Sequence, residues 1–185
     1  MGLSKTIWTN PSEFLRTQQP VNPVMFFAPA VLQATARRFI DQAKLDEAVA
    51  AIFATVPNAQ LDTITVDLAS LESIRAATSR ARQRFAKIDI LINNAGVMAT
   101  PFQHTHDGFE MQIGTNHFGH FALTGELFPL IERGHLKRIV NLSSRGHHFA
   151  PVDFDDPHFE RRAYDPWIAY GHSKTANVLF SVGIE

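Results

Sequence analysis

Apolar residues recur along the chain at two spacings, one typical of helices and one typical of strands. From Asp41 to Thr55, and again from Ser70 to Phe85, they return every three or four residues, which predicts two amphipathic helices. The segment 61–68 between them is short and rich in β-branched residues, which predicts a strand. The remaining predicted elements are a buried strand over 88–92, a long helix over 108–131, a buried strand over 138–142 and a helix over 167–182.

Strands that alternate with helices in this way indicate an α/β fold, a Rossmann-like doubly wound parallel sheet with helices on both faces. In such sheets, ligands bind beyond the carboxyl ends of the strands. Two polar segments directly follow predicted strands, 93–96 after one and 143–144 after the other. The one long irregular connection, 149–166, comes soon after the second segment, so we expect the functional site in this region.

Composition narrows the class of protein. The 185 residues suit one domain, and a formal net charge of −1 with scattered basic residues gives no long-range attraction for nucleic acid. The absence of cysteine excludes disulfides and thiolate chemistry and fits the reducing cytoplasm. The most apolar stretch, Val24 to Leu32, is too short to span a membrane and contains Pro29. We therefore expect a cytoplasmic protein with no membrane span and no nucleic-acid partner.

Tyr170 and Lys174 form the first candidate for chemistry. They lie four residues apart in the last predicted helix, so their side chains project from the same face. A positive charge beside a phenol favours the phenolate, and we expect it to lower the pKa of Tyr170 from about 10 toward neutrality, as proton exchange with an alcohol or carbonyl oxygen requires. Taken alone, this spacing equally fits a surface tyrosine packed on a lysine stem.

Two other polar positions add to this pair. Ser143 and Ser144 follow the strand predicted over 138–142, where a hydroxyl can point into the crevice and donate to a substrate oxygen. Asn116 falls in the middle of the long helix predicted over 108–131. Because asparagine is a poor helix former, this position indicates a local distortion or a buried polar role.

With these residues, the chain resembles the short-chain dehydrogenases/reductases, and especially their retinol-dehydrogenase-like branch. The resemblance covers roughly residues 31 to 180 and consists of five blocks in the family's order, each of which follows or contains a predicted element. The blocks are Asp67-Leu68, Asn93-Asn94-Ala95-Gly96, Thr115-Asn116-His117-Phe118-Gly119-His120-Phe121, Arg138-Ile139-Val140-Asn141-Leu142-Ser143-Ser144 and Tyr170-Gly171-His172-Ser173-Lys174-Thr175-Ala176-Asn177.

The resemblance implies a catalytic tetrad of Asn116, Ser144, Tyr170 and Lys174. By this likeness, Tyr170 is the acid/base, while Lys174 lowers its pKa and holds the nicotinamide ribose. Ser144 orients the substrate oxygen, and Asn116 supports a proton relay. We choose Ser144 over Ser143 because the second serine of the pair is the catalytic one in the family.

The resemblance also implies a nicotinamide cofactor, NADP or NAD, and a small alcohol or carbonyl substrate. Asp67 and Leu68 would flank the adenine, and Asn94, Ala95 and Gly96 would line the ribose, together with Tyr170 and Lys174. The cofactor does the redox chemistry, and the protein supplies placement and charge stabilisation. The family further implies a homodimer through the helices that carry Asn116 and Tyr170.

The N-terminal part departs from the family pattern. Members begin with a strand and a glycine-rich turn, whose bare backbone lets the pyrophosphate approach a helix N-terminus. Here no glycine occurs between Gly2 and Gly96, so we expect this first strand and turn to be missing or replaced. Compared with the family, the sequence reads as truncated at both ends, with 1–23 an atypical N-terminal segment and 24–185 a partial Rossmann-fold domain.

The segment from Val24 to Arg38 is similar to the family's second strand running into its following helix. Arg37 and Arg38 would then stand where members that prefer NADP often keep a basic residue. The missing first strand is central in a sheet ordered 3-2-1-4-5-6, so its absence would separate strand three from strand four. In a second interpretation, Val24 to Leu32 fills that gap instead.

Two functional hypotheses follow. The first is an NAD(P)-dependent oxidoreductase, and the second is a non-catalytic relative or gene fragment that keeps the fold and dimer surface but binds no cofactor. A metal site is not expected, since no carboxylate-histidine spacing completes a set with His104 and His106 or with His117 and His120. A serine hydrolase is disfavoured because Ser144 lacks a Gly-x-Ser-x-Gly motif.

Overall fold

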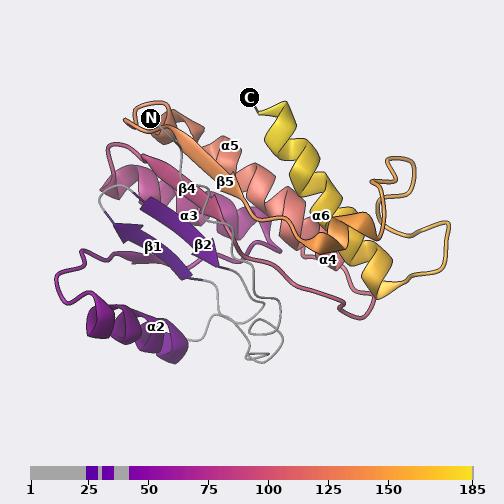
Figure 1. Ribbon diagram of the computed structural model, residues 1–185, viewed down its shortest axis with the longest axis horizontal. Coiled ribbons are helices and arrows are strands. Elements are labelled where there is room, and N and C mark those ends of the chain that lie inside the picture. Colours follow the sequence, from indigo (N-terminus) through magenta and orange to yellow (C-terminus); the bar gives the residue numbers. More distant parts are fainter. Residues whose placement is uncertain (1–23, 29–30, 36–41, 185) are drawn as a thin grey trace.

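The computed structural model describes residues 24–28, 31–35 and 42–184 of the chain (Figure 1). The segment 1–23, Arg37 and Arg38 lie outside the described residues. The elements are β1 (Val24–Ala28), β2 (Val31–Thr35), α2 (Gln42–Thr55), β3 (Thr63–Ile64), α3 (Leu71–Arg84), β4 (Ile90–Asn93), α4 (Met111–Ile113), the π-helix η1 (Gly114–Phe118), α5 (Gly119–Ile131), β5 (Arg138–Asn141), the 3-10 helix η2 (Arg145–His148) and α6 (Pro166–Gly183).

The five described strands form one sheet in the order β3-β1-β2-β4-β5. β2, β4 and β5 run parallel, whereas β1 is antiparallel to both of its neighbours, so the sheet is mixed and not fully parallel. β1 and β2 occupy the positions between β3 and β4, as the second interpretation of the 24–32 segment proposed. The prediction of one strand running into a helix over 24–38 is wrong. Only two residues separate β1 from β2, and so short a connection can join only antiparallel neighbours.

The apolar core lies between the sheet and the two helices α3 and α5 (Figure 1). α6 lies next to α5 on the same side, and α2 lies apart from these helices, beyond β1. The predicted helix over 70–85 is confirmed as α3. The Ser70 side chain caps this helix by accepting a hydrogen bond from the Ser73 amide at 3.2 Å. The buried core residues are Ile64, Val66, Leu68, Ile74, Ala77, Ala81, Ile88, Leu91, Ala95, Leu123, Leu127, Leu130 and Ile131.

Two strand predictions need correction. β3 includes only Thr63 and Ile64 of the segment predicted over 61–68. β5 was predicted as a buried strand, yet Arg138 and Val140 are exposed. The reason is its place at the edge of the described sheet, where it pairs with β4 alone.

The long helix predicted over 108–131 begins at Met111 and contains a π-helical segment, η1, in its interior. The Gly119 amide donates to the Gly114 carbonyl, five residues back. Asn116 lies in the middle of this segment, which confirms the local distortion expected there. Such π-segments inside α-helices occur frequently at functional sites.

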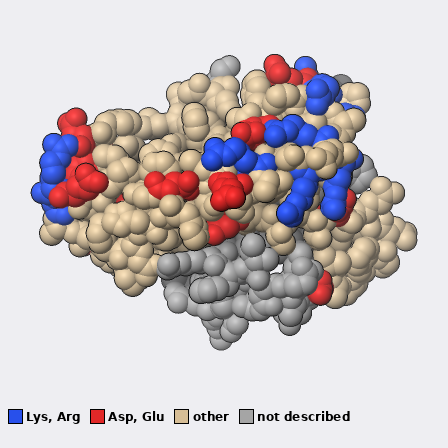
Figure 2. All heavy atoms as spheres, turned by 180° about the vertical axis from the view of Figure 1, so that it is seen from behind, with Lys and Arg blue, Asp and Glu red and all other residues tan. Residues whose placement is uncertain are grey.

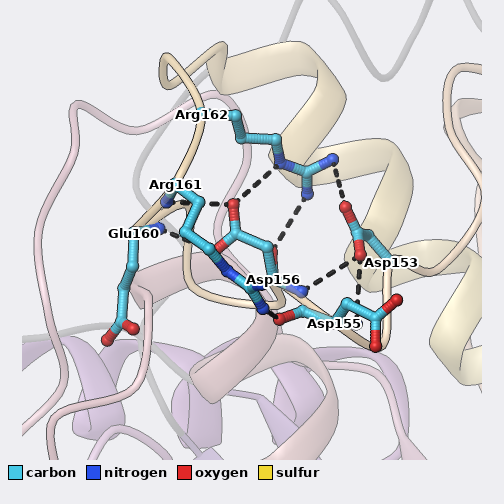
Figure 3. A network of polar contacts seen from close by, with 6 residues as sticks. All are labelled: Asp153, Asp155, Asp156, Glu160, Arg161 and Arg162. Carbon is cyan, nitrogen blue, oxygen red and sulfur yellow. Dashed lines mark hydrogen bonds and ion pairs between the residues drawn. The ribbon is translucent and has the colours of Figure 1, made fainter.

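The irregular connection 149–166 holds its shape through its own charged side chains (Figure 3). The Asp156 carboxylate accepts hydrogen bonds from the Glu160 amide at 2.8 Å and the Arg161 amide at 3.2 Å. The Arg162 guanidinium pairs with Asp153 at 3.0 Å and with Asp156 at 3.6 Å. This network fixes the middle of the loop that leads into α6. In the described part of the chain, no helix is both long and apolar enough to cross a membrane.

Candidate active site

The candidate site is built where β4 and β5 end and α6 passes beside them. β4 and β5 are parallel and paired in register, so the segments that follow them leave the same edge of the sheet. Asn94 to Gly96 follow β4, and Ser143 and Ser144 follow β5. Tyr170 and Lys174 lie in the first half of α6. The structure therefore brings together the serine, tyrosine and lysine that the sequence predicted.

The Lys174 side chain is buried, with 6% of its surface exposed. Its ammonium donates a hydrogen bond to the Leu142 carbonyl at 3.2 Å, at the end of β5. Burial disfavours the charged form and lowers the pKa of Lys174 to about 8. The group is therefore still mostly protonated at neutral pH and loses its charge in mildly alkaline solution.

The Tyr170 phenol is also buried, with 8% of the residue exposed. Burial raises its pKa above the ordinary value, and a hydrogen bond with the Ser144 side chain opposes that rise. The prediction that Lys174 lowers the pKa of Tyr170 toward neutrality is therefore wrong for the chain as described. The Lys174 ammonium lies 5.8 Å from the centre of the tyrosine ring, and burial of the phenol is the largest influence on its pKa.

The two neighbouring serines point in different directions. The Ser143 hydroxyl donates to the Lys174 carbonyl at 2.9 Å and so fixes the backbone of α6. The Ser144 hydroxyl accepts from the Gly146 amide at 3.1 Å and lies close enough to Tyr170 to bond to the phenol. Of the two serines, Ser144 is therefore the one that lies beside the Tyr170 phenol.

Gly146 makes room for the tyrosine ring. A Cβ at this position would lie 2.7 Å from Cε1 and 2.8 Å from Cδ1 of Tyr170, closer than any ordinary carbon–carbon contact. The ring therefore packs directly on bare backbone in η2. Position 146, two residues after Ser144, therefore has to be glycine if the Tyr170 ring is to keep its place.

Asn116 is fully buried and holds the loop after β4 in place. Its Oδ1 accepts from the Val97 amide at 2.8 Å, and its Nδ2 donates to the Val97 carbonyl at 2.9 Å and to the Ser173 hydroxyl at 2.9 Å. A Cβ at Gly96 would lie 2.9 Å from the Asn116 oxygen and 3.6 Å from the Lys174 nitrogen. Asn116 thus connects the loop that contains Gly96 to the helix that carries Tyr170 and Lys174.

The predicted cofactor-contacting residues fall into two groups. Asn94 and Gly96 are exposed beside the site, whereas Ala95 and Leu68 have their side chains in the core and could offer a ligand only their backbone. The Asp67 carboxylate accepts from the Ala69 amide at 2.8 Å. Asp67 follows β3, which β1 and β2 separate from β4 in the sheet. A long ligand would be needed to reach from Asp67 to Gly96.

Sequence reasoning missed several buried polar residues that support the tetrad. Ser173 donates to the Tyr170 carbonyl at 2.7 Å while it accepts from Asn116. His120 lies 2.9 Å from the Asn116 carbonyl through Nδ1, which must be the donor because a carbonyl oxygen only accepts. Burial lowers the pKa of His120 to about 4, so the ring is neutral at pH 7. The four-residue spacing of Asn116 and His120 was the available signal for this contact.

The surface charges and the possible metal ligands were compared with the sequence expectations. Figure 2 shows acidic and basic side chains lying beside one another on the face opposite to that of Figure 1. The described residues contain no group of three or more histidine, aspartate or glutamate side chains placed to hold a metal ion.

Comparison with known proteins gives the following relationships. The family model for short chain dehydrogenase matches residues 27–153. A protein of Streptomyces lividans named "Probable oxidoreductase" is 50% identical over 114 residues, which cover 61% of this chain and 38% of that protein. Human retinol dehydrogenase 13 is 43% identical over 141 residues, covering 76% of this chain and 43% of the relative. The chain thus spans less than half the length of these two relatives.

A solved structure is also similar to this chain in its three-dimensional fold. An uncharacterized protein from Mycobacterium paratuberculosis superposes with a TM-score of 0.63 at 39% identity, over 76% of this chain and 48% of that chain. The family match over residues 27–153 includes β4, β5, Asn116 and Ser144, and it ends before Tyr170 and Lys174.

Proposed function

Because the chain belongs to the short-chain dehydrogenase/reductase family, we propose that it transfers a hydride between a nicotinamide cofactor and an alcohol or carbonyl compound. The observation that supports this most directly is the meeting of Ser144, Tyr170 and Lys174 at the ends of β4 and β5. Asn116 joins them through Ser173. Such a group can handle a proton at a substrate oxygen while the cofactor, NAD or NADP, supplies or accepts the hydride.

The residues fit the nicotinamide end of such a cofactor. Gly96 presents bare backbone beside Asn116 and Lys174, and a side chain there would come within 2.9 Å of the Asn116 oxygen. Lys174, Tyr170, Asn94 and Gly96 are the residues that would hold the ribose. The phosphate end fits less well, because no glycine occurs between Gly2 and Gly96 and a pyrophosphate needs close approach to backbone amides.

The protonation state of the Tyr170 phenol defines its part in the proposed reaction. A phenol with a raised pKa is protonated at neutral pH, so Tyr170 is set to donate its proton to a carbonyl oxygen. The Ser144 hydroxyl, beside the phenol, would orient the same oxygen. Lys174, charged below about pH 8, would hold the nicotinamide ribose and not set the pKa of Tyr170. We therefore propose that Tyr170 is the proton donor when a carbonyl compound is reduced.

We further propose an apolar substrate. Phe149 and Trp167 are half exposed beside Tyr170, with ring centroids 6.3 Å apart, and the Trp167 ring lies 6.5 Å from that of Tyr170. Together with Asp165 and Ile168 they line a shallow cavity of about 440 Å³. Retinol dehydrogenases among the relatives act on an apolar alcohol by their name, which agrees with such a surface.

A homodimer through α5 and α6 is part of the proposal. These two helices border an apolar groove of about 680 Å³, lined by Phe118, Phe121, Phe128, Leu179 and Phe180 among others. Phe121, Phe128 and Leu179 are exposed, which is unusual for large apolar side chains gathered at one place on a monomer. A second copy that packed its own α5 and α6 there would cover them. Sedimentation velocity should then show a dimer, which Phe121→Glu would dissociate. The cytoplasmic location remains a prediction.

The second candidate function is a non-catalytic relative that keeps the fold but binds no cofactor. One observation favours it, the lack of glycine from residue 3 to residue 95, where the family places its phosphate-binding turn. Among the described residues, β1 and β2 form a hairpin in that part of the sheet.

A cofactor titration separates the two candidates. NADPH and NADH are added to the purified chain up to millimolar concentration, and binding is followed by nucleotide fluorescence and by thermal shift. The oxidoreductase proposal predicts saturable binding of at least one nucleotide, weakened in Lys174→Met. Absence of any saturable signal, with the fold intact by circular dichroism, would refute it.

A further inference from the structure

Gln112 is a buried amide in α4, four residues before Asn116, and like Asn116 it is 0% exposed. Its Oε1 accepts a hydrogen bond from the Ala99 amide at 2.9 Å. Its Nε2 donates to the Tyr164 hydroxyl at 2.9 Å and to the Pro166 carbonyl at 2.8 Å. The three contacts use both donors and the acceptor of the side chain, so its orientation is fixed.

Gln112 and Asn116 tie the same segments of the protein together. Asn116 binds the backbone of Val97 and reaches Ser173 in α6, while Gln112 binds the backbone of Ala99 and reaches the first residue of α6. Each amide side chain thus connects the helix 111–131 to the loop after β4 and to α6. Because the contacts lie at different points of both partners, the pair restrains their orientation as well as their separation.

The contact with Ala99 holds an unfavourable backbone conformation. Ala99 has a φ of +49°, in the left-handed region that non-glycine residues rarely adopt. Such a conformation persists only where the surroundings determine it. The Gln112 oxygen binds the amide of this residue, three positions after Gly96 in the loop that borders the site. The path of that loop therefore depends on Gln112.

The contact with Pro166 acts on the helix that carries Tyr170. In an α-helix the carbonyl of residue 166 is the acceptor for the amide of residue 170, so Gln112 shares this carbonyl with the Tyr170 backbone. From these contacts we infer that Gln112 is a positioning residue, which sets the place of the Tyr170 phenol relative to Gly96 and Ser144. The inference rests on the proposed function, since positioning of Tyr170 matters only if Tyr170 reacts.

Hydrogen exchange tests the positioning without any need for turnover. Gln112→Met removes both donors and the acceptor with little change in length, and Gln83→Met makes the same replacement at an exposed site on α3 as a matched control. We expect the amides of 97–100 and 167–170 to exchange about tenfold faster in Gln112→Met, with α3 amides and the control unchanged. Equal acceleration of α3 amides, or no acceleration at all, would overturn the inference.

A second variant covers the case in which Gln112→Met does not fold. Gln112→Glu, followed at a pH that ionises the new carboxyl group, keeps an acceptor for the Ala99 amide but loses both donors. We expect it to leave 97–100 protected and to accelerate only 167–170. Acceleration of both segments, or of neither, would contradict the assigned contacts.

Turnover then tests the consequence for the reaction. If the unaltered chain reduces a carbonyl compound, Gln112→Met should lower kcat about tenfold and change KM for the carbonyl substrate much less, whereas Gln83→Met should change neither. An unchanged kcat together with faster exchange at 167–170 would refute the positioning role. Absence of turnover in the unaltered chain would refute the proposed function alone, and the exchange experiment would still decide whether Gln112 holds the two segments.

Discussion

The contact between Gly146 and Tyr170 gives the sharpest prediction. Gly146→Ala adds a single carbon, which would lie 2.7 Å from Cε1 of the tyrosine ring. Carbon atoms in contact stay about 3.5 to 4.0 Å apart, so the ring has to withdraw by about 1 Å. A misplacement of this size in a reacting group can cost about 100-fold in rate. We therefore expect kcat for carbonyl reduction to fall about 100-fold.

The matched control is Gly125→Ala, because no atom outside the backbone of its own helix lies within 4 Å of a Cβ built at Gly125 in α5. This replacement should leave kcat unchanged and stabilise the fold by about 0.5 to 1 kcal/mol. The assay is NADPH oxidation under saturating substrate, with urea unfolding of both variants in parallel. Ultraviolet titration of the phenolate follows Tyr170 independently of turnover. Since burial is the main cause of its raised pKa, displacement toward solvent should lower it.

A folded Gly146→Ala variant whose kcat and phenol titration both match those of the unaltered chain would refute the predicted clash. In that case the ring would not need the space that the bare backbone provides. If Gly125→Ala lost activity to the same extent, the effect would not be specific to the contact with Tyr170.

Three further predictions concern the buried polar groups. The pKa of Lys174 is lowered to about 8 from 10.5, so the unfolded chain binds more protons between these values and the chain should gain roughly 3 kcal/mol of stability from pH 8 to pH 10.5 relative to Lys174→Met, by urea unfolding. The pKa of His120 is lowered to about 4 from 6.5, so stability should fall as pH drops through that window, and His120→Gln should flatten the slope. Asn116→Ala leaves the half-buried Val97 amide without its partner and should cost about 1 to 3 kcal/mol in urea unfolding.

Each of these three stability predictions can be contradicted by a specific result. Parallel stability curves for Lys174→Met and the unaltered chain above pH 8 would show that the ammonium is not desolvated. An unchanged acid slope in His120→Gln would mean that His120 does not titrate on unfolding. A cost below a few tenths of a kcal/mol for Asn116→Ala would place Val97 in contact with water.

Much of the fold could be predicted from the sequence where one apolar period dominates. The helix over 70–85 has a capping serine and a regular apolar face, and it forms as α3. The π-helix around Asn116 was foreseen only as a distortion, because the propensity of one residue shows a conflict but not its geometry. The exposure of β5 depends on which strands lie beside it, and the pattern of 138–142 alone contains no information about neighbours.

The candidate site was predictable from the sequence where its residues lie on one regular element. Tyr170 and Lys174 share one helix, so their proximity follows from their spacing. The pKa of Tyr170 depends instead on burial, which the sequence does not give, and its predicted direction was wrong. Gln112 and Gly146 act through contacts with segments distant in sequence, and no local pattern indicates such contacts.

Consecutive residues of extended backbone face opposite ways, and Ser143 and Ser144 show what this implies for the strand before them. Ser144 has φ −154° and ψ 159° and turns toward the phenol, while Ser143 turns toward the backbone of α6. A slip of β5 by a single position against β4 would turn each of the two hydroxyls to the opposite face. The alignment that sets Ile90 opposite Arg138 and Asn93 opposite Asn141 therefore selects which serine lies beside the Tyr170 phenol.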